Sequence, residues 1–123
     1  MGNLPEPEIT KHGRVTLISL GPEYENLDET LLDSLQPALF AAVEEADPPY
    51  VVLDLSKTKF FGSSFIEIII RMINRVESQR HGEFALSGLT IYCAEVLEIT
   101  HLDSIWKIFP NSEAAIAALS NDA

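Results

Sequence analysis

The sequence predicts an α/β domain with a mixed, mostly parallel sheet of four to five strands and four helices. Three observations predict this class. Short β-branched runs alternate along the chain with longer segments whose apolar residues recur at helical spacing. Residues 50–55 are apolar almost throughout, as strands are when helices cover both faces of a parallel sheet. The length of 123 residues is usual for one domain.

The expected domain boundaries follow from composition at the two ends. Residues 1–8 contain two prolines and two glutamates and are expected to form a flexible leader. A single domain then covers residues 9–119, and residues 120–123 form a short tail. The hydrophobic content of 46% is typical of globular proteins, so we expect one ordinary core.

Strand and helix signals follow one another in the first half of the chain. The alternating run 15–20 predicts a strand, and residues 9–11 predict a short partner strand across a turn at 12–13. Apolar residues at helical spacing then predict a helix over 29–45. Pro37 lies inside this helix, which is expected to kink or to divide there.

The second half continues the same alternation. The strand at 50–55 is followed by a loop and by a long helix from 63 to about 80, whose apolar side chains share one stripe. Four further elements alternate as strand, helix, strand and helix, at 83–88, 92–101, 105–109 and from 112 onward. Such alternation implies α/β layers joined by right-handed crossovers.

The acidic balance of the chain excludes some partners. Eight Lys and Arg residues stand against 19 Asp and Glu residues, for a formal net charge of -11. A field of this sign repels nucleic acid and anionic membranes, whose binding requires clustered cations. Five of the eight cations lie in residues 57–80, so we expect a partner to meet local positive charge there.

Cysteine use and apolar run lengths predict the compartment. Cys93 is the only cysteine, so no intrachain disulfide forms, and we expect a buried structural thiol in a reducing compartment. The first residues lack the pattern of a secretory signal, and no apolar run is long enough to cross a bilayer. The sequence therefore predicts a cytoplasmic protein without membrane insertion.

The most informative segment joins the strand at 50–55 to the long helix. Paired serines open this helix, and Glu67 follows Ser64 at the spacing of a capping box. In that arrangement the Ser64 hydroxyl and the Glu67 carboxylate satisfy each other's backbone amides. Ser63 is left without an evident structural role, which makes it the candidate functional residue.

This segment resembles the STAS domain of bacterial anti-sigma factor antagonists. The resemblance rests on the VVLDL strand at 51–55, the apolar pair at 60–61 and the following serine pair. It continues through 97–109 and 112–115 and covers about residues 9–119. The resemblance implies a protein-interaction module of bacterial transcription regulation. It also implies that a partner anti-sigma factor or related serine kinase phosphorylates the first serine, here Ser63.

The residues around Ser63 are the expected partner contacts. They lie in the loop and the first helical turn: Lys57, Lys59, Phe60, Phe61, Gly62 and Phe65. Gly62 stands where the family pattern has aspartate, and Phe65 where it has glycine. These departures favour an alternative, a non-phosphorylated STAS scaffold subunit of a transporter or signalling complex. A weak homodimer through an uncovered edge strand also stays open.

We expect no enzymatic activity, no cofactor and no metal site. Ser63 as a nucleophile would need a base, and the candidates are His81 and His101. His81 is expected about five helical turns from Ser63, roughly 25 Å along a straight helix. The glycines of a nucleophile elbow are missing. The histidines and Cys93 lack metal-ligand spacing, and there is no glycine-rich nucleotide loop.

Overall fold

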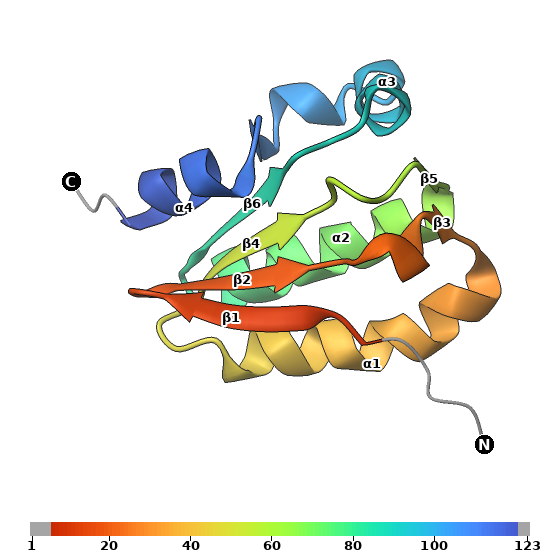
Figure 1. The fold of residues 1–123 in the computed structure, drawn as a ribbon. Helices are drawn as coiled ribbons and strands as arrows, with labels where there is room; N and C mark the ends of the chain where they lie inside the picture. Colours follow the sequence, from red (N-terminus) through yellow and green to blue (C-terminus); the bar gives the residue numbers. More distant parts are fainter. Residues whose placement is uncertain (1–5, 121–123) are drawn as a thin grey trace.

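The computed structural model describes residues 6–120 and places five strands of this range in one mixed sheet (Figure 1). The spatial order is β1-β2-β4-β6-β7. Only the pair β1 and β2 is antiparallel, and the other three pairs are parallel. The bounds of the five strands are Glu8–His12, Val15–Ser19, Tyr50–Asp54, Glu83–Ser87 and Lys107–Phe109. The predicted fold class is confirmed.

Helices cover the two faces of this sheet unequally. Figure 1 shows α1 and α2 side by side along one face and α4 against the other, with α3 near the end where the parallel strands finish. The helices span Glu29–Glu45, Ser63–Ile73, Ile91–Ile99 and Ser112–Ser120. Three short helical segments complete the helical structure of the described residues: η1 (Pro22–Tyr24), η2 (Asn74–Gln79, of π type) and η3 (Leu102–Ser104).

The central strand β4 is buried on both faces, as its apolar run predicts. Val51 and Leu53 belong to the large core under α1 and α2, while Val52 belongs to a smaller core with Ala115 and Leu119 of α4. Alternate side chains of a strand point to opposite faces, so β4 requires apolar residues at both sets of positions. The rigid centre of the sheet therefore positions the loop that follows β4.

Helix α1 has the predicted bounds and does not divide at Pro37. Asp28 precedes it in an extended conformation and accepts a hydrogen bond from the Leu31 amide at 2.9 Å, an ordinary N-cap. Pro37 is exposed on the outer side of the helix, while Leu35 and Leu39 on the inner side are buried. Burial of the apolar stripe holds the helix together across the proline.

Several boundaries differ from expectation by one or two residues. The hairpin turn falls at Gly13 and Arg14 rather than at 12–13, and Gly13 has the positive φ of +64° that a tight turn favours. Glu8, assigned to the leader, already belongs to β1. Residues 6 and 7 of the leader have no regular secondary structure, and Ser120, assigned to the tail, is the last residue of α4. Residues 1–5 and 121–123 lie outside the described residues.

A small second sheet has no signal in the sequence. Strand β3 (Asn26–Leu27) pairs in parallel with β5 (Phe60–Phe61), beyond the end of the main sheet. In Figure 1 the two lie next to the start of α2 and below α3. This pairing ties the segment before α1 to the segment before α2, where the candidate site lies.

Candidate functional site

The loop between β4 and β5 is held on one side by the segment before α1. The backbone amides of Lys59 and Phe60 both donate to the Glu25 carbonyl oxygen, at 2.7 and 3.1 Å. The Lys59 ammonium also contacts the Glu25 carboxylate at 2.9 Å, and this hydrogen bond raises the pKa of Lys59. Lys59 is therefore already paired and is only partly available to a partner.

Helix α3 holds the same loop from the other side. The Thr58 carbonyl oxygen accepts hydrogen bonds from the Thr90 hydroxyl at 3.1 Å and from the Cys93 thiol at 3.5 Å. Cys93 is buried, and this burial raises the pKa of its thiol. A buried, protonated thiol that donates to a carbonyl has a structural role, as the sequence predicts.

Ser63 is the first residue of α2 and is exposed. Gly62 is the N-cap, and it has no side chain to bind the free amides of the first turn. Within residues 6–120, the Ser63 hydroxyl and the backbone amides of Ser63 and Ser64 have no hydrogen-bond partner. The start of α2 thus offers an exposed hydroxyl beside two unused donors at the positive end of a helix dipole.

The predicted capping box of Ser64 and Glu67 is wrong. The helix starts two residues earlier than a capping Ser64 requires, so Ser64 is the second residue of the helix and not its cap. Its hydroxyl donates instead to the Glu29 carboxylate of α1 at 3.2 Å. Glu67 forms an exposed ion pair with Arg71 at 3.5 Å, one helical turn later. Neither serine therefore caps the helix, since Gly62 occupies the N-cap position.

Two of the aromatic residues expected to contact a partner are core residues. Phe65 is fully buried and Phe61 is 8% exposed, and their rings pack against each other with centroids 5.2 Å apart. Phe65 belongs to the same inward stripe of α2 as Ile69 and Met72. The prediction that Phe65 contacts a partner is therefore wrong, since its side chain has no exposed surface.

Phe60 is the aromatic residue of this segment that reaches the surface. Its side chain is 52% exposed, and its ring stacks on Tyr92 of α3, with centroids 5.5 Å apart. Residues alternate in direction along a strand, so the inward turn of Phe61 requires the outward turn of Phe60. The exposed set around Ser63 is thus Phe60, Gly62 and the two lysines, Lys57 and Lys59.

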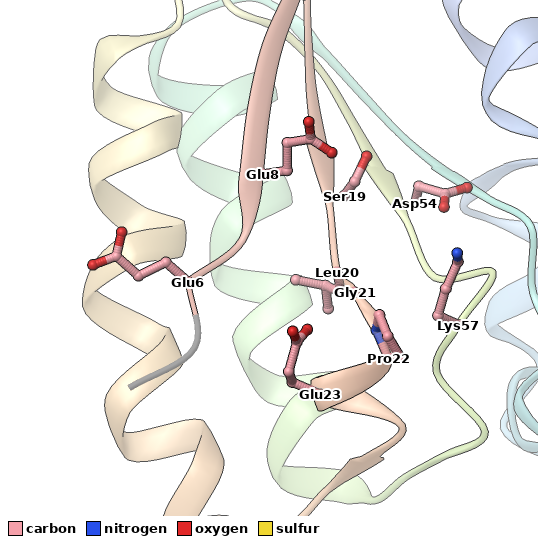
Figure 2. Close-up of a pocket in the computed structure, with 9 residues that line it drawn as sticks. All are labelled: Glu6, Glu8, Ser19, Leu20, Gly21, Pro22, Glu23, Asp54 and Lys57. Atoms are coloured by element: carbon pink, nitrogen blue, oxygen red, sulfur yellow. The ribbon is translucent and has the colours of Figure 1, made fainter. Parts of the chain in front are cut away.

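A shallow pocket of about 500 Å³ lies beside Lys57 at the ends of β2 and β4 (Figure 2). Figure 2 shows Lys57 and Asp54 on its β4 side, with Glu8 and Glu23 on the side of β1 and η1. Within the described range Lys57 forms no ion pair, but most charged groups of the lining are acidic. The pocket therefore disfavours an anionic ligand.

Asp54 has a structural role at this edge of the sheet. Its carboxylate accepts hydrogen bonds from the Ser56 hydroxyl at 2.6 Å and the Ser87 hydroxyl at 2.8 Å, which joins the ends of β4 and β6. Gly88 adopts a φ of +71°, and a Cβ atom there would meet Asp54 and Ser56 at 2.9 Å. The polar residue inside the VVLDL run thus fixes the start of the loop.

The residues considered for catalysis or metal binding lie apart. His81 follows η2, at the opposite end of the α2–η2 helix from Ser63, and His101 follows α3 with a φ of +62°. In residues 6–120 no three His, Cys, Asp or Glu side chains are grouped so that they could hold a metal ion. Within the same range no helix is both long and apolar enough to cross a membrane.

Two contributors to the site have no signal that sequence reasoning used. Glu25 holds Lys59 and Phe60 from a distant segment, and Tyr92 supports Phe60 from α3. Tyr92 was available as a clue because it falls off the buried stripe of its helix, which contains Cys93 and Leu97. An aromatic residue outside such a stripe indicates a surface role.

Comparison with known proteins agrees with this geometry. A sequence model of the STAS domain matches residues 6–115, most of the chain. This chain belongs to the STAS domain family. A comparison with curated protein sequences finds no match.

Solved structures of STAS proteins have the same fold. An anti-sigma-factor antagonist (STAS) domain protein from Planctomyces limnophilus is 36% identical, with a TM-score of 0.83 over 92% of this chain and 97% of its own. An anti-sigma factor antagonist from Mycobacterium paratuberculosis is 23% identical, with a TM-score of 0.77, over 94% and 93%. The Bacillus cell fate determinant SpoIIAA in its phosphorylated form is 16% identical, with a TM-score of 0.65, over 91% and 97%.

Proposed function

We propose that this STAS domain is an anti-sigma factor antagonist that works in the cytoplasm as a protein-interaction switch without enzymatic activity. In this proposal an anti-sigma factor or a related serine kinase docks at the start of α2 and phosphorylates Ser63. One observation supports the proposal above others: Ser63 is exposed, without a structural partner, on a segment fixed from two sides. The name of the 36% identical relative supports the partner class.

The immediate surroundings of Ser63 explain why added charge would matter. The two free amides and the helix dipole favour an anion at the start of α2. Two nearby carboxylates oppose it, Glu29 of α1 and Glu67 one turn further along α2, and each is already engaged, by Ser64 and by Arg71. A phosphate would add about -1.5 to -2 charges to this balance.

The added charge would lower the affinity of a partner that docks over Ser63. Phe60 gives the neutral surface an apolar contact beside Ser63, and burying a charged phosphate against it would require desolvation. A penalty of about 3 kcal/mol corresponds to a weakening of roughly 100-fold. Lys57 and Lys59 supply the local cations that steer an acidic partner surface toward the loop.

A charge substitution at each end of the same helix tests the switch. Ser63→Asp adds one negative charge at the start of α2, and Ser78→Asp adds the same charge at an exposed serine of η2, at the opposite end. A partner that co-purifies with the tagged wild-type protein from its native cells is then titrated against both variants. We expect Ser63→Asp to lose the partner and Ser78→Asp to keep it.

The same experiment identifies the alternative function. Gly62 and Phe65 stand where the family pattern has aspartate and glycine, and these two departures favour a constitutive scaffold subunit of a transporter or signalling complex. Equal affinity of wild type, Ser63→Asp and Ser78→Asp for the partner would contradict the switch and favour the scaffold. Loss of binding in both variants would show a general effect of charge and also contradict the switch.

A further inference from the structure

Most of the large apolar side chains that the protein exposes lie on one part of its surface. Within residues 6–120, seven large hydrophobic residues are exposed. Five of them belong to β5, α3 and the turn after η3: Phe60, Ile91, Tyr92, Ile99 and Ile105. Single exposed apolar residues are normal, but such a concentration on a small domain indicates a binding surface.

Four of these residues lie on or against the exposed side of α3. Tyr92 and Ile99 are seven residues apart, so they lie two turns apart on the same side of α3, and Ile91 adjoins Tyr92. Ile91 and Ile99 are 73% and 77% exposed, although Cys93 and Leu97 on the inner side are buried. The Phe60 ring continues this surface because it stacks on Tyr92. We call Phe60, Ile91, Tyr92 and Ile99 the α3 face.

The charges on this helix have one sign. Glu95 lies between Tyr92 and Ile99 on the exposed side, and Glu98 is exposed next to Ile99. Helix α3 contains no Lys or Arg, and the nearby Lys59 is paired with Glu25. The α3 face is therefore apolar with fixed negative charge inside and beside it.

We propose that the α3 face binds an amphipathic helix of the partner, with an apolar stripe flanked by Lys and Arg. This proposal deepens the proposed function and rests on it, because Phe60 joins the α3 face to the surface beside Ser63. Tyr92 and Ile99 are about 10 Å apart along the axis, which matches apolar residues at i and i+7 of a second helix. Lys or Arg beside that stripe would meet Glu95 and Glu98.

The charge pattern excludes two other occupants. A second copy of the chain would set Glu95 and Glu98 against the same residues of its neighbour, on a protein whose net charge is already -11. An anionic bilayer would meet the same repulsion, since the surface has no basic residues to attract it. A cationic helix is the occupant whose charge complements the face.

A designed peptide tests the chemistry directly. The probe is an 18-residue helical peptide with Leu at the i, i+3, i+4 and i+7 positions and Lys elsewhere, and its control has Glu in place of every Lys. Backbone amide shifts in a ¹H–¹⁵N spectrum report where each peptide binds. We expect the Lys peptide to shift amides of α3 and β5 with micromolar affinity, and the Glu peptide to bind at least tenfold more weakly.

Matched variants separate the α3 face from general attraction to an acidic protein. Ile99→Asp places a charge on the face, and Ile70→Asp makes the same change at an exposed isoleucine of α2 outside it. We expect Ile99→Asp to lower the affinity for the Lys peptide at least tenfold and Ile70→Asp to change this affinity less than twofold. Both sites are exposed, and a thermal melt of each variant checks that it folds.

Three results would overturn the proposal: no shift of α3 amides by the Lys peptide, equal affinity of both peptides, or equal effects of the two Asp variants. With the native partner, failure here is distinguishable from failure of the switch. Loss of binding by Ser63→Asp but not by Ile99→Asp leaves the switch and overturns the α3 face. Loss by Ile99→Asp but not by Ser63→Asp leaves the α3 face and contradicts the switch.

Discussion

The two ends of the α2–η2 helix are finished in opposite ways. At the C-terminal end, Arg75 forms a bidentate ion pair with Glu44 of α1, and the Arg80 guanidinium donates to the Val43 carbonyl oxygen at 2.6 Å. The Glu77 carboxylate there accepts the Lys107 ammonium at 3.0 Å. The polar groups of η2 are thus used to join it to α1 and the sheet.

The N-terminal end uses few of its polar groups, the Ser64 hydroxyl being joined to Glu29 of α1. Gly62 provides no cap, and the Ser63 hydroxyl and the first amides have no partner in the described part of the chain. Apolar packing of Phe65 holds this end instead. The comparison teaches that the helix is anchored by one end and by its buried stripe, which leaves the other end available to a partner.

Removal of the buried aromatic ring at the N-terminal end of α2 should have the largest effect on stability. Phe65→Ala deletes a fully buried ring on the first turn of α2 and leaves a cavity, so we expect it to lower the free energy of unfolding by about 3–5 kcal/mol. Urea denaturation measures this change, and Phe65→Leu should lose clearly less. A change below about 1 kcal/mol would contradict the view that packing holds this end.

Removal of a hydrogen bond at the C-terminal end of the α2–η2 helix should have an intermediate effect on stability. Arg80→Met keeps the apolar stem but leaves the Val43 carbonyl oxygen near the end of α1 without its charged donor. We expect the free energy of unfolding to fall by about 1–2 kcal/mol in urea denaturation. An unchanged free energy of unfolding would mean that the C-terminal end of the helix, like the N-terminal end, is held by apolar packing alone.

Replacement of Thr58 should stabilise the protein. Its hydroxyl is fully buried and has no hydrogen-bond partner within residues 6–120. Thr58→Val removes this unsatisfied group at nearly constant shape. We therefore expect the free energy of unfolding to increase by roughly 1 kcal/mol, which a higher melting temperature would report. Thr16→Val, at a buried threonine of β2, serves as the comparison. A lower melting temperature for Thr58→Val would overturn this reading of the loop.

Addition of the missing cap should have a small stabilising effect. A Cβ atom at Gly62 would meet no atom within 4 Å, and the backbone there is extended, so Gly62→Asp fits without strain. An aspartate can accept hydrogen bonds from the free amides of the first turn, which predicts a gain of a few tenths of a kcal/mol in thermal denaturation. A loss of stability would contradict free donors at this end.

The smallest expected effect is the pH dependence of stability that the Glu44–Arg75 pair contributes at the C-terminal end of the helix. Hydrogen bonding to Arg75 lowers the pKa of the exposed Glu44 carboxyl. A carboxyl with a lowered folded-state pKa stabilises the protein above its unfolded pKa, and this contribution disappears as pH falls through the folded pKa. Wild type should therefore be slightly more stable than Glu44→Gln near pH 7 and should lose this advantage in acid. A difference that grows in acid would contradict this sign.

The fold was predictable because local patterns and long-range packing agree. The bounds of α1 follow from an apolar stripe and an Asp28 cap, and β4 follows from an uninterrupted apolar run. The β3–β5 pair joins residues 34 positions apart with two residues each, Asn26 with Phe60 and Leu27 with Phe61, too short for any periodicity. Such pairing depends on the assembled fold and has no local signal.

The candidate site was predictable only in part, for physical reasons. Two neighbouring serines can each cap a helix, and only the backbone conformation assigns that position to Gly62. Phe65 belongs to the apolar stripe of its helix, so its burial could have been inferred from the same spacing that predicted the helix. Tyr92 lies off the buried stripe of α3, so its exposure could have been inferred in the same way, whereas its stacking on Phe60 depends on the assembled fold.

Phosphoserine placed at one position of the chain tests the central claim most directly. Genetic-code expansion can introduce phosphoserine at 63 or, as the matched control, at 78, and the affinity of the purified native partner is then measured by calorimetry at one salt concentration. We predict a weakening of roughly 100-fold for phosphate at 63 and less than about twofold at 78. Equal affinities for both phosphorylated proteins and the unmodified protein would contradict the account.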